Sequence, residues 1–194
     1  LNLDEGSGNI AYDQSGNGNN GTLINNPTWT TETAPITWSI NALKFDGIDD
    51  YIAVAPSPSL SPPSINKLTI EFWIKINGSG VMRVVDDTQI IAGGGYFINI
   101  FDGKVHIGLN NDASSYLISN TILEINQWYH IAAVYDGTII KIFINGVQDP
   151  ITKLYNNPIY VYSKILHIGK NHQINSNYLN ATLDDLKISY SALY

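Results

Sequence analysis

The chain has 194 residues, of which 44% are hydrophobic and 14% are charged, so it has enough apolar side chains to form a folded core. Its net charge is −7 with only 10 Lys and Arg residues, which argues against a basic surface for nucleic acid. Cysteine is absent, which excludes disulfides, zinc–thiolate sites and a cysteine nucleophile. An acidic, oxygen-rich surface instead suits hard cations such as calcium.

The chain is predicted to be a series of strands, because runs of β-branched and aromatic residues alternate between two faces and end at Gly, Pro, Asn or Asp. The expected strands are residues 1–8, 42–45, 51–54, 68–76, 89–92, 96–101, 104–109, 116–119, two runs within 127–146, 159–162, 165–169 and 181–190. Residues 22–24 and 28–38 are expected to be irregular, and residues 46–50 are expected to form a hairpin turn between two paired strands. No stretch shows sustained helical periodicity.

The hairpin within residues 127–146 is predicted to be central. Asp136 and Gly137 separate two strand-like runs, and Asp-Gly is a strong signal for a tight turn. In the second run Ile140, Ile142 and Ile144 fall on one face, which is the alternation of a half-buried strand. No linker-like segment divides the chain, so a single all-β domain over residues 1–194 is the simplest interpretation.

Several stretches resemble, in the same order, the laminin-G-like jelly-roll domains of the concanavalin A-like lectin/glucanase superfamily, which include pentraxin-like members. These stretches are residues 3–8, 13–21, 42–52, 68–75, 128–146, 166–169 and 181–188. The resemblance implies a two-sheet antiparallel jelly-roll sandwich, with ligand sites on a concave face or on its rim loops. It indicates function only weakly, because lectins, adhesion modules and glycosidases share the fold.

The first candidate calcium site combines Asp13, Asn17 and Asn19 with Asp184 or Asp185. Asp and Asn oxygens at alternate positions, with glycines between them, offer the ligands that calcium prefers. The resemblance implies a structural calcium ion joining the first and last strands. The alternative is that these side chains only cap turns through bonds to their own backbone.

The second candidate calcium site is Asp86 and Asp87 with Asn171 and Gln173. These residues occupy the places where pentraxin-like relatives hold a calcium ion that bridges to ligand. The later loop carries no carboxylate here, which lowers the expected affinity. Adjacent acids that bind no ion normally lie in water.

A third acidic cluster, Asp46, Asp49 and Asp50, looks like a calcium loop, but it lacks the later glutamate of an EF-hand. We favour a purely structural turn for it.

Glycan binding would use aromatic rings that stack on sugar C–H faces, beside amides that bond the hydroxyls. The expected ligand-binding residues share a loop or near-loop position, and they are Tyr155, Tyr160, Tyr162, His172 and Tyr178. The alternative is that these tyrosines only pack the fold. Trp29, Trp38, Trp73 and Trp128 are expected to belong to the core.

We expect a non-catalytic, calcium-dependent carbohydrate-binding or adhesion module that acts at the cell surface or outside the cell. The glutamates Glu5, Glu32, Glu71 and Glu124 are few, and none has a strand partner that would complete a glycosidase pair. The expected partner is a glycan or a cell-surface glycoprotein, with no nucleic acid and no membrane insertion. The chain begins at Leu1, so it is expected to be part of a larger multidomain protein. The alternatives are a structural spacer, a protein-binding domain or a glycosidase with unusual residues.

Overall fold

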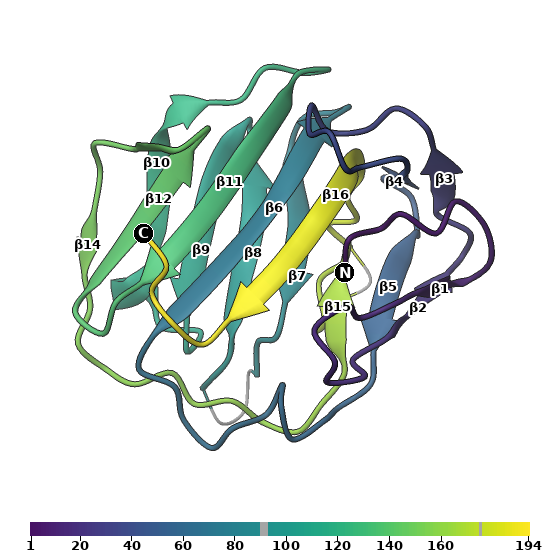
Figure 1. The fold of residues 1–194 in the computed structure, drawn as a ribbon. Coiled ribbons are helices and arrows are strands. Elements are labelled where there is room, and N and C mark those ends of the chain that lie inside the picture. The colour runs from purple at the N-terminus through teal and green to yellow at the C-terminus, as the bar shows by residue number, and fades with distance from the viewer. Residues whose placement is uncertain (90–92, 175) are drawn as a thin grey trace.

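The computed structural model describes residues 1–89, 93–174 and 176–194, and its strands form two antiparallel sheets that pack face to face (Figure 1). Sheet A has the spatial order β1 (Ile10–Ala11), β2 (Gly21–Ile24), β5 (Tyr51–Val54), β15 (Leu166–Ile168), β7 (Val81–Asp86), β8 (Tyr96–Phe101), β9 (Lys104–Leu109) and β10 (Leu117–Ile122). Sheet B has the order β13 (Val147–Gln148), β12 (Ile139–Ile144), β11 (Trp128–Tyr135), β6 (Leu68–Ile76), β16 (Asn180–Ser189), β4 (Ala42–Asp46) and β3 (Thr28–Thr30), and β14 (Lys153–Leu154) also pairs with β12.

The core lies between the sheets. The predicted apolar face of β6 is fully buried, with Phe72 at its centre and isoleucines on either side. Ile98 and Ile100 of β8 belong to the same buried cluster from the side of sheet A. Alternation of side chains therefore gives each sheet one face toward the core and one outer face.

The predicted central hairpin is confirmed. Strands β11 and β12 pair from Ile131↔Ile144 to Tyr135↔Ile140. The carboxylate of Asp136 accepts hydrogen bonds from the backbone N–H groups of Thr138 (3.0 Å) and Ile139 (2.9 Å), and Gly137 has a φ of 100°. Asp and Gly thus perform the two tasks that a tight turn requires.

The N-terminal predictions were wrong. Residues 1–8 form no strand, because Leu3 has a φ of 58° and Gly6 and Gly8 also have positive φ values. This segment is held instead by Asp4, whose carboxylate accepts from the N–H groups of residues 40 and 41. Residues 22–24 and 28–38 were expected to be irregular, but residues 21–24 and 28–30 are strands β2 and β3. They are too short to show a clear period of two.

The predicted pairing of residues 42–45 with residues 51–54 was also wrong. Both segments are strands, but β4 belongs to sheet B and β5 to sheet A. The turn at residues 46–50 therefore carries the chain from one sheet to the other (Figure 1). A local turn signal cannot distinguish a hairpin from such a crossing, because both need the same turn residues.

The region around β7 differs most from the prediction. Strand β7 was missed, because buried Arg83 breaks the apolar pattern and a bulge lies between Arg83 and Val85. The expected strand at 89–92 lies largely outside the described residues. Residues 159–162 form only an isolated bridge between Ile159 and Ile65.

Helical structure within the described ranges is limited to the 3-10 turn Ala113–Ser115. Among these same residues, no helix has the length and apolar character needed to cross a membrane.

Candidate functional site

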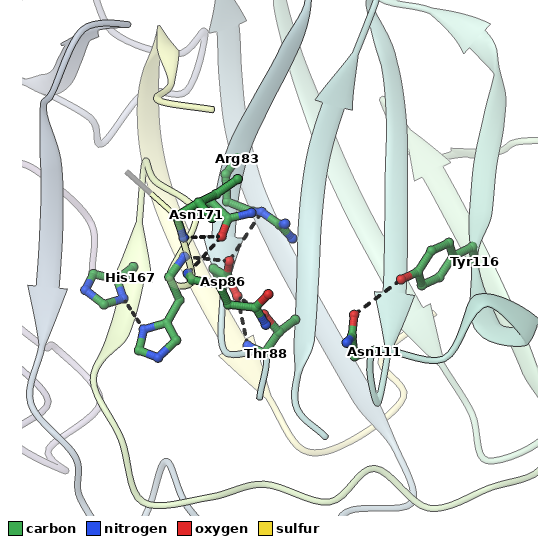
Figure 2. Close-up of polar contacts among 10 residues, drawn as sticks. Arg83, Asp86, Thr88, Asn111, Tyr116, His167 and Asn171 are labelled. Atoms are coloured by element: carbon green, nitrogen blue, oxygen red, sulfur yellow. Dashed lines mark hydrogen bonds and ion pairs between the residues drawn. The ribbon is translucent and has the colours of Figure 1, made fainter. Parts of the chain in front are cut away.

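The structure brings together the residues of the second candidate calcium site at the end of β7. Asp86 pairs in register with His167 of the neighbouring strand β15, and the loop after β15 returns Asn171 and Gln173 to the same place. Figure 2 shows Asp86 below Arg83 and Asn171, with Thr88 close by. Chain segments more than 80 residues apart therefore meet around one carboxylate.

The carboxylate of Asp86 is fully buried and both of its oxygens have partners. Oδ1 accepts from the N–H (2.8 Å) and the hydroxyl (2.6 Å) of Thr88. Oδ2 accepts from the N–H of His172 at 2.8 Å and lies 3.4 Å from Nε of Arg83. Asp86 therefore holds the loop after β15 against β7.

The other residues of this cluster are also engaged. Oδ1 of Asn171 accepts from the N–H groups of Gln173 (2.8 Å) and Ile174 (3.2 Å), and Gln173 donates its side-chain amide to the hydroxyl of Thr88. A calcium ion would have to displace these donors and the positive charge of Arg83. The arrangement does not fit the ion as it stands, and calcium binding here stays a prediction.

Asp87 lies apart from this network. Its side chain is buried and its Oδ2 has no hydrogen-bond partner in the described part of the chain. Burial raises the pKa of Asp87 to about 7, opposed by the positive charge of Lys164 and reinforced by Asp86. The two adjacent acids thus differ in their surroundings, since both oxygens of Asp86 have donors while Oδ2 of Asp87 is buried without one among the described residues.

Beside Arg83, the outer face of sheet A carries a packed layer of rings. The Arg83 guanidinium lies 4.3 Å from the centre of the Phe97 ring, and His106 meets the edges of Phe97 and Tyr116 at 5.1 and 5.2 Å. Figure 2 shows the hydroxyl of Tyr116 directed toward Asn111, to whose Oδ1 it donates at 3.4 Å. Burial, together with the charge of Arg83, lowers the pKa of His106 to about 4.

The first candidate calcium site is only partly assembled. The carboxylate of Asp13 accepts from the N–H (3.0 Å) and hydroxyl (2.8 Å) of Ser15 and from the N–H of Asn19 (2.9 Å). Burial tends to raise the pKa of Asp13, but these hydrogen bonds outweigh it and lower the pKa. Asn17 bonds Ser15, and Asn19 bonds the hydroxyls of Ser57 and Ser59.

Asp184 and Asp185 are neighbours in strand β16, but they lie in different surroundings. Asp185 lines a cleft of 510 Å³ together with Asp13, Asn17 and Asn19. Asp184 lies away from them on the outer face of sheet B, where its Oδ2 accepts from the N–H of Ala34 and the hydroxyl of Ser39. The oxygens of Asp13 accept bonds within the turn and that of Asn19 accepts from Ser57 and Ser59, so this loop offers few free ligands, and a calcium ion here stays a prediction.

The structure does not gather the expected sugar-binding residues into one surface. Tyr155 is buried against Tyr135, and its hydroxyl accepts from Asn110. Tyr160 and Tyr162 are exposed, His172 lies 3.0 Å from His167 between their Nδ1 atoms, and Tyr178 is half-buried. Of this set, Tyr160 and Tyr162 remain accessible enough to stack on a ligand.

A groove on the outer face of sheet B was missed, because the tryptophans were expected in the core. None of the four is fully buried, and Trp38 is 67% exposed. Trp73 of β6 and His130 of β11 are register partners with ring centres 5.3 Å apart. With neighbouring side chains they bound a hollow of 380 Å³, lined by Pro35, Trp73, Trp128, His130, Asn145 and Gly146.

The sequence did contain a signal for this groove. In β6, Trp73 alternates with the buried isoleucines and therefore shares a face with Glu71 and Lys75. A tryptophan on the polar face of an amphipathic strand is accessible.

Glu32, Glu71 and Asp184 near the groove each have at least one protein partner, although Oδ1 of Asp184 is buried without one among the described residues. Glu32 forms an ion pair with Lys75. Glu71 accepts from Lys187 (3.0 Å) and from the hydroxyl of Tyr194 (2.8 Å). Asp184 is bound beneath the loop at residues 34–39.

Two antiparallel sheets packed around one core make this protein a β-sandwich of the jelly-roll type. A family model described as the concanavalin A-like lectin/glucanases superfamily matches residues 46–194, and the chain belongs to this family. The predicted two-sheet antiparallel jelly-roll fold and the laminin-G-like resemblance are confirmed.

Solved structures with the same fold include three toxin domains. The binding domain of paraclostridial mosquitocidal protein 1 superposes with a TM-score of 0.74 at 18% identity, over 94% of this chain and 47% of that one. The binding domain of botulinum neurotoxin serotype G gives 0.68 at 16% identity, over 94% and 46%. The binding domain of botulinum neurotoxin DC, solved in complex with rat synaptotagmin II, gives 0.64 at 18% identity, over 94% and 46%. The chain thus spans about half the length of these structures, and at such identities the likeness shows the fold alone. None of the curated proteins matches the chain.

Proposed function

We propose that this protein is a non-catalytic carbohydrate-binding module, and that the groove at Trp73 and Trp128 is its glycan site. The observation that carries the proposal is the groove itself, where two half-buried tryptophans, His130 and Asn145 surround a hollow of 380 Å³. Indole rings bind the C–H faces of sugars, and a side-chain amide bonds their hydroxyls. A family of lectin-like sandwiches and fold neighbours that are binding domains support this assignment.

The groove is well prepared for a ligand. The backbone N–H of His130 donates to Oδ1 of Asn145 at 2.8 Å, and the His130 ring packs on Trp73. Burial lowers the pKa of His130, so the ring is neutral at pH 7 and can both donate and accept a hydrogen bond. Lys75 approaches the ring of Trp128 at 5.9 Å and restrains it.

The state of the carboxylates near the groove favours sugar binding over sugar hydrolysis. A retaining glycosidase uses two free carboxyl groups about 5 Å apart on either side of the sugar bond. Here Glu71, Glu32 and Asp184 each have a protein partner. An extracellular or cell-surface location, with a glycan or glycoprotein as partner, follows from this proposal and belongs to it.

Binding to a glycan array, followed by titration of the best ligand, tests the proposal. Trp128→Ala is expected to weaken binding about 10-fold, which corresponds to the loss of one aromatic stacking contact. The matched control is Tyr160→Ala, which removes an exposed ring from the tyrosine set outside the groove. Thermal unfolding of each variant separates loss of the site from loss of the fold.

Two results would contradict the proposal. Either the wild-type protein binds no glycan on the array, or Trp128→Ala binds as tightly as wild type while Tyr160→Ala does not. The first result would favour a spacer or protein-binding role, and the second would move the site to the exposed tyrosines.

A further inference from the structure

The turn between β4 and β5 gathers three carboxylates where the chain crosses from sheet B to sheet A. One carboxylate oxygen from each of Asp46, Asp49 and Asp50 lies within 4.8 Å of the other two. The turn is fixed in shape, since Gly47 has a φ of 81° and a Cβ there would lie 2.8 Å from Cβ of Asn180. The three acids are therefore held together by backbone geometry.

Local hydrogen bonds use only some of the oxygens. Oδ1 of Asp46 accepts from the N–H of Ile48 at 2.8 Å, and Oδ2 of Asp50 accepts from the N–H of Asp46 at 3.1 Å. These two bonds close the turn. Within the described ranges, the carboxylate of Asp49 and the Oδ1 atom of Asp50 receive no hydrogen bond.

The Oδ1 atom of Asp50 is the second, independent sign of a ligand. Asp50 is only 3% exposed, and this oxygen is buried without a donor. A buried carboxylate oxygen without a partner is costly, because it has lost water and gained nothing in exchange. A bound cation would supply the missing partner.

The charge of the cluster is also unbalanced. No ion pair in the described part of the chain involves these three acids. Three carboxylates so close together repel one another unless a positive charge lies among them. The side chain of Asn25 donates to the carbonyl of Asp49 at 3.0 Å, which helps to hold the cluster but adds no charge.

We propose that Asp46, Asp49 and Asp50 bind a divalent cation, and that the cation is calcium. Calcium accepts six to eight oxygen ligands at 2.3–2.6 Å in flexible geometry, so three carboxylates and water can form its shell around oxygens spread over less than 5 Å. Asp46 and Asp49 face solvent, which leaves room for the water ligands. A site with so few protein ligands is expected to have a Kd of roughly 10⁻⁴–10⁻³ M, as in extracellular calcium modules.

The position of the site gives the ion a structural role. It would lie where β4 of one sheet passes to β5 of the other, close to the first residue of β16. A ligand that binds only the folded state stabilises it, so saturating calcium is expected to raise the Tm by about 2–4 °C.

The test is a calcium titration of the chelator-treated protein, followed by thermal unfolding. A second readout is terbium luminescence excited through tyrosine, because Tyr51 follows Asp50 directly and can act as the antenna. The decisive variant is Asp49→Asn, which changes an exposed side chain without a protein donor and so leaves the fold intact. Asp102→Asn, an exposed acid in the turn between β8 and β9, is the matched control.

Wild type and Asp102→Asn are expected to gain thermal stability and luminescence, while Asp49→Asn loses both or needs at least 10-fold more ion. The proposal is overturned if wild type shows no shift at 100-fold the expected Kd, or if Asp49→Asn responds like wild type. It is equally overturned if Asp13→Asn abolishes the response, since the ion then lies in the first loop. Glycan binding plays no part in either readout, so this test stands apart from that of the groove.

Discussion

The end of β7 and the turn between β4 and β5 each place adjacent aspartates close together, yet their carboxylates have opposite surroundings. Asp86 accepts from Thr88 and His172 and lies beside Arg83, so donors surround it on every side. Asp50 has one backbone donor on Oδ2, its Oδ1 atom is buried without a donor in the described part of the chain, and its carboxylate lies close to those of two more acids. The comparison of Asp86 with Asp50 indicates that a carboxylate oxygen is available to a cation only where the fold supplies no donor for it.

The largest expected effect separates the two clusters by stability. Asp86→Asn places a side-chain amide group against the N–H donors that now face the carboxylate. It also leaves the buried charge of Arg83 unpaired. We therefore expect the free energy of unfolding to fall by about 3–5 kcal/mol. In chelator, Asp49→Asn is expected to change the free energy of unfolding by less than about 0.5 kcal/mol. Urea unfolding at pH 7 measures both. Equal effects for the two variants would remove the distinction between the clusters.

A smaller effect is expected for Asp50→Asn, whose stability relative to wild type should change sign when calcium is added. Asp50→Asn removes a buried charge that repels Asp46 and Asp49, while its amide oxygen can still accept from the N–H of Asp46. In chelator we expect the variant to be more stable than wild type by up to about 1 kcal/mol. In saturating calcium we expect it to be less stable, because one ligand is lost. Thermal unfolding in both buffers measures the two differences, and a difference of the same sign in both would count against a bound ion.

Much of the fold could be predicted from the sequence, because its signals are local. The apolar alternation of β6 and the Asp136-Gly137 turn lie within single stretches, and both were located correctly. Strand β7 was missed because its central residue is a buried arginine, which no period-two pattern anticipates. Its burial depends on Phe97 and Asp86, which only the folded sheet brings beside it.

The candidate sites were less predictable, since they depend on which groups become neighbours. The resemblance placed Asp86 near Asn171, but it could not show that the backbone N–H of His172 would donate a hydrogen bond to the Asp86 carboxylate. The third acidic cluster was interpreted as a hairpin turn, because nothing local shows that β4 and β5 lie in different sheets. The Trp73 groove was visible in the strand pattern, and expecting every tryptophan in the core concealed it.

The smallest expected effect concerns Arg83, the cation beside Asp86, which is separated from His106 by the ring of Phe97. Burial and the charge of Arg83 lower the pKa of folded His106 to about 4, whereas the unfolded side chain titrates near 6.5. Between these values the unfolded state binds the proton first, so this histidine's contribution to stability is lost as the pH falls from 6.5 to 4. His106→Phe keeps a ring between Phe97 and Tyr116 and removes the titration.

Relative to wild type, His106→Phe should therefore gain on the order of 1 kcal/mol between pH 7 and pH 4.5, discounted for partial exposure of the ring. Urea unfolding of both proteins at several pH values measures this difference. Asp87 and His167 also titrate in this window, but they are present in both proteins and cancel in the comparison. If the two proteins lose stability in parallel, burial and the charge of Arg83 do not lower the pKa of His106, and the prediction is wrong.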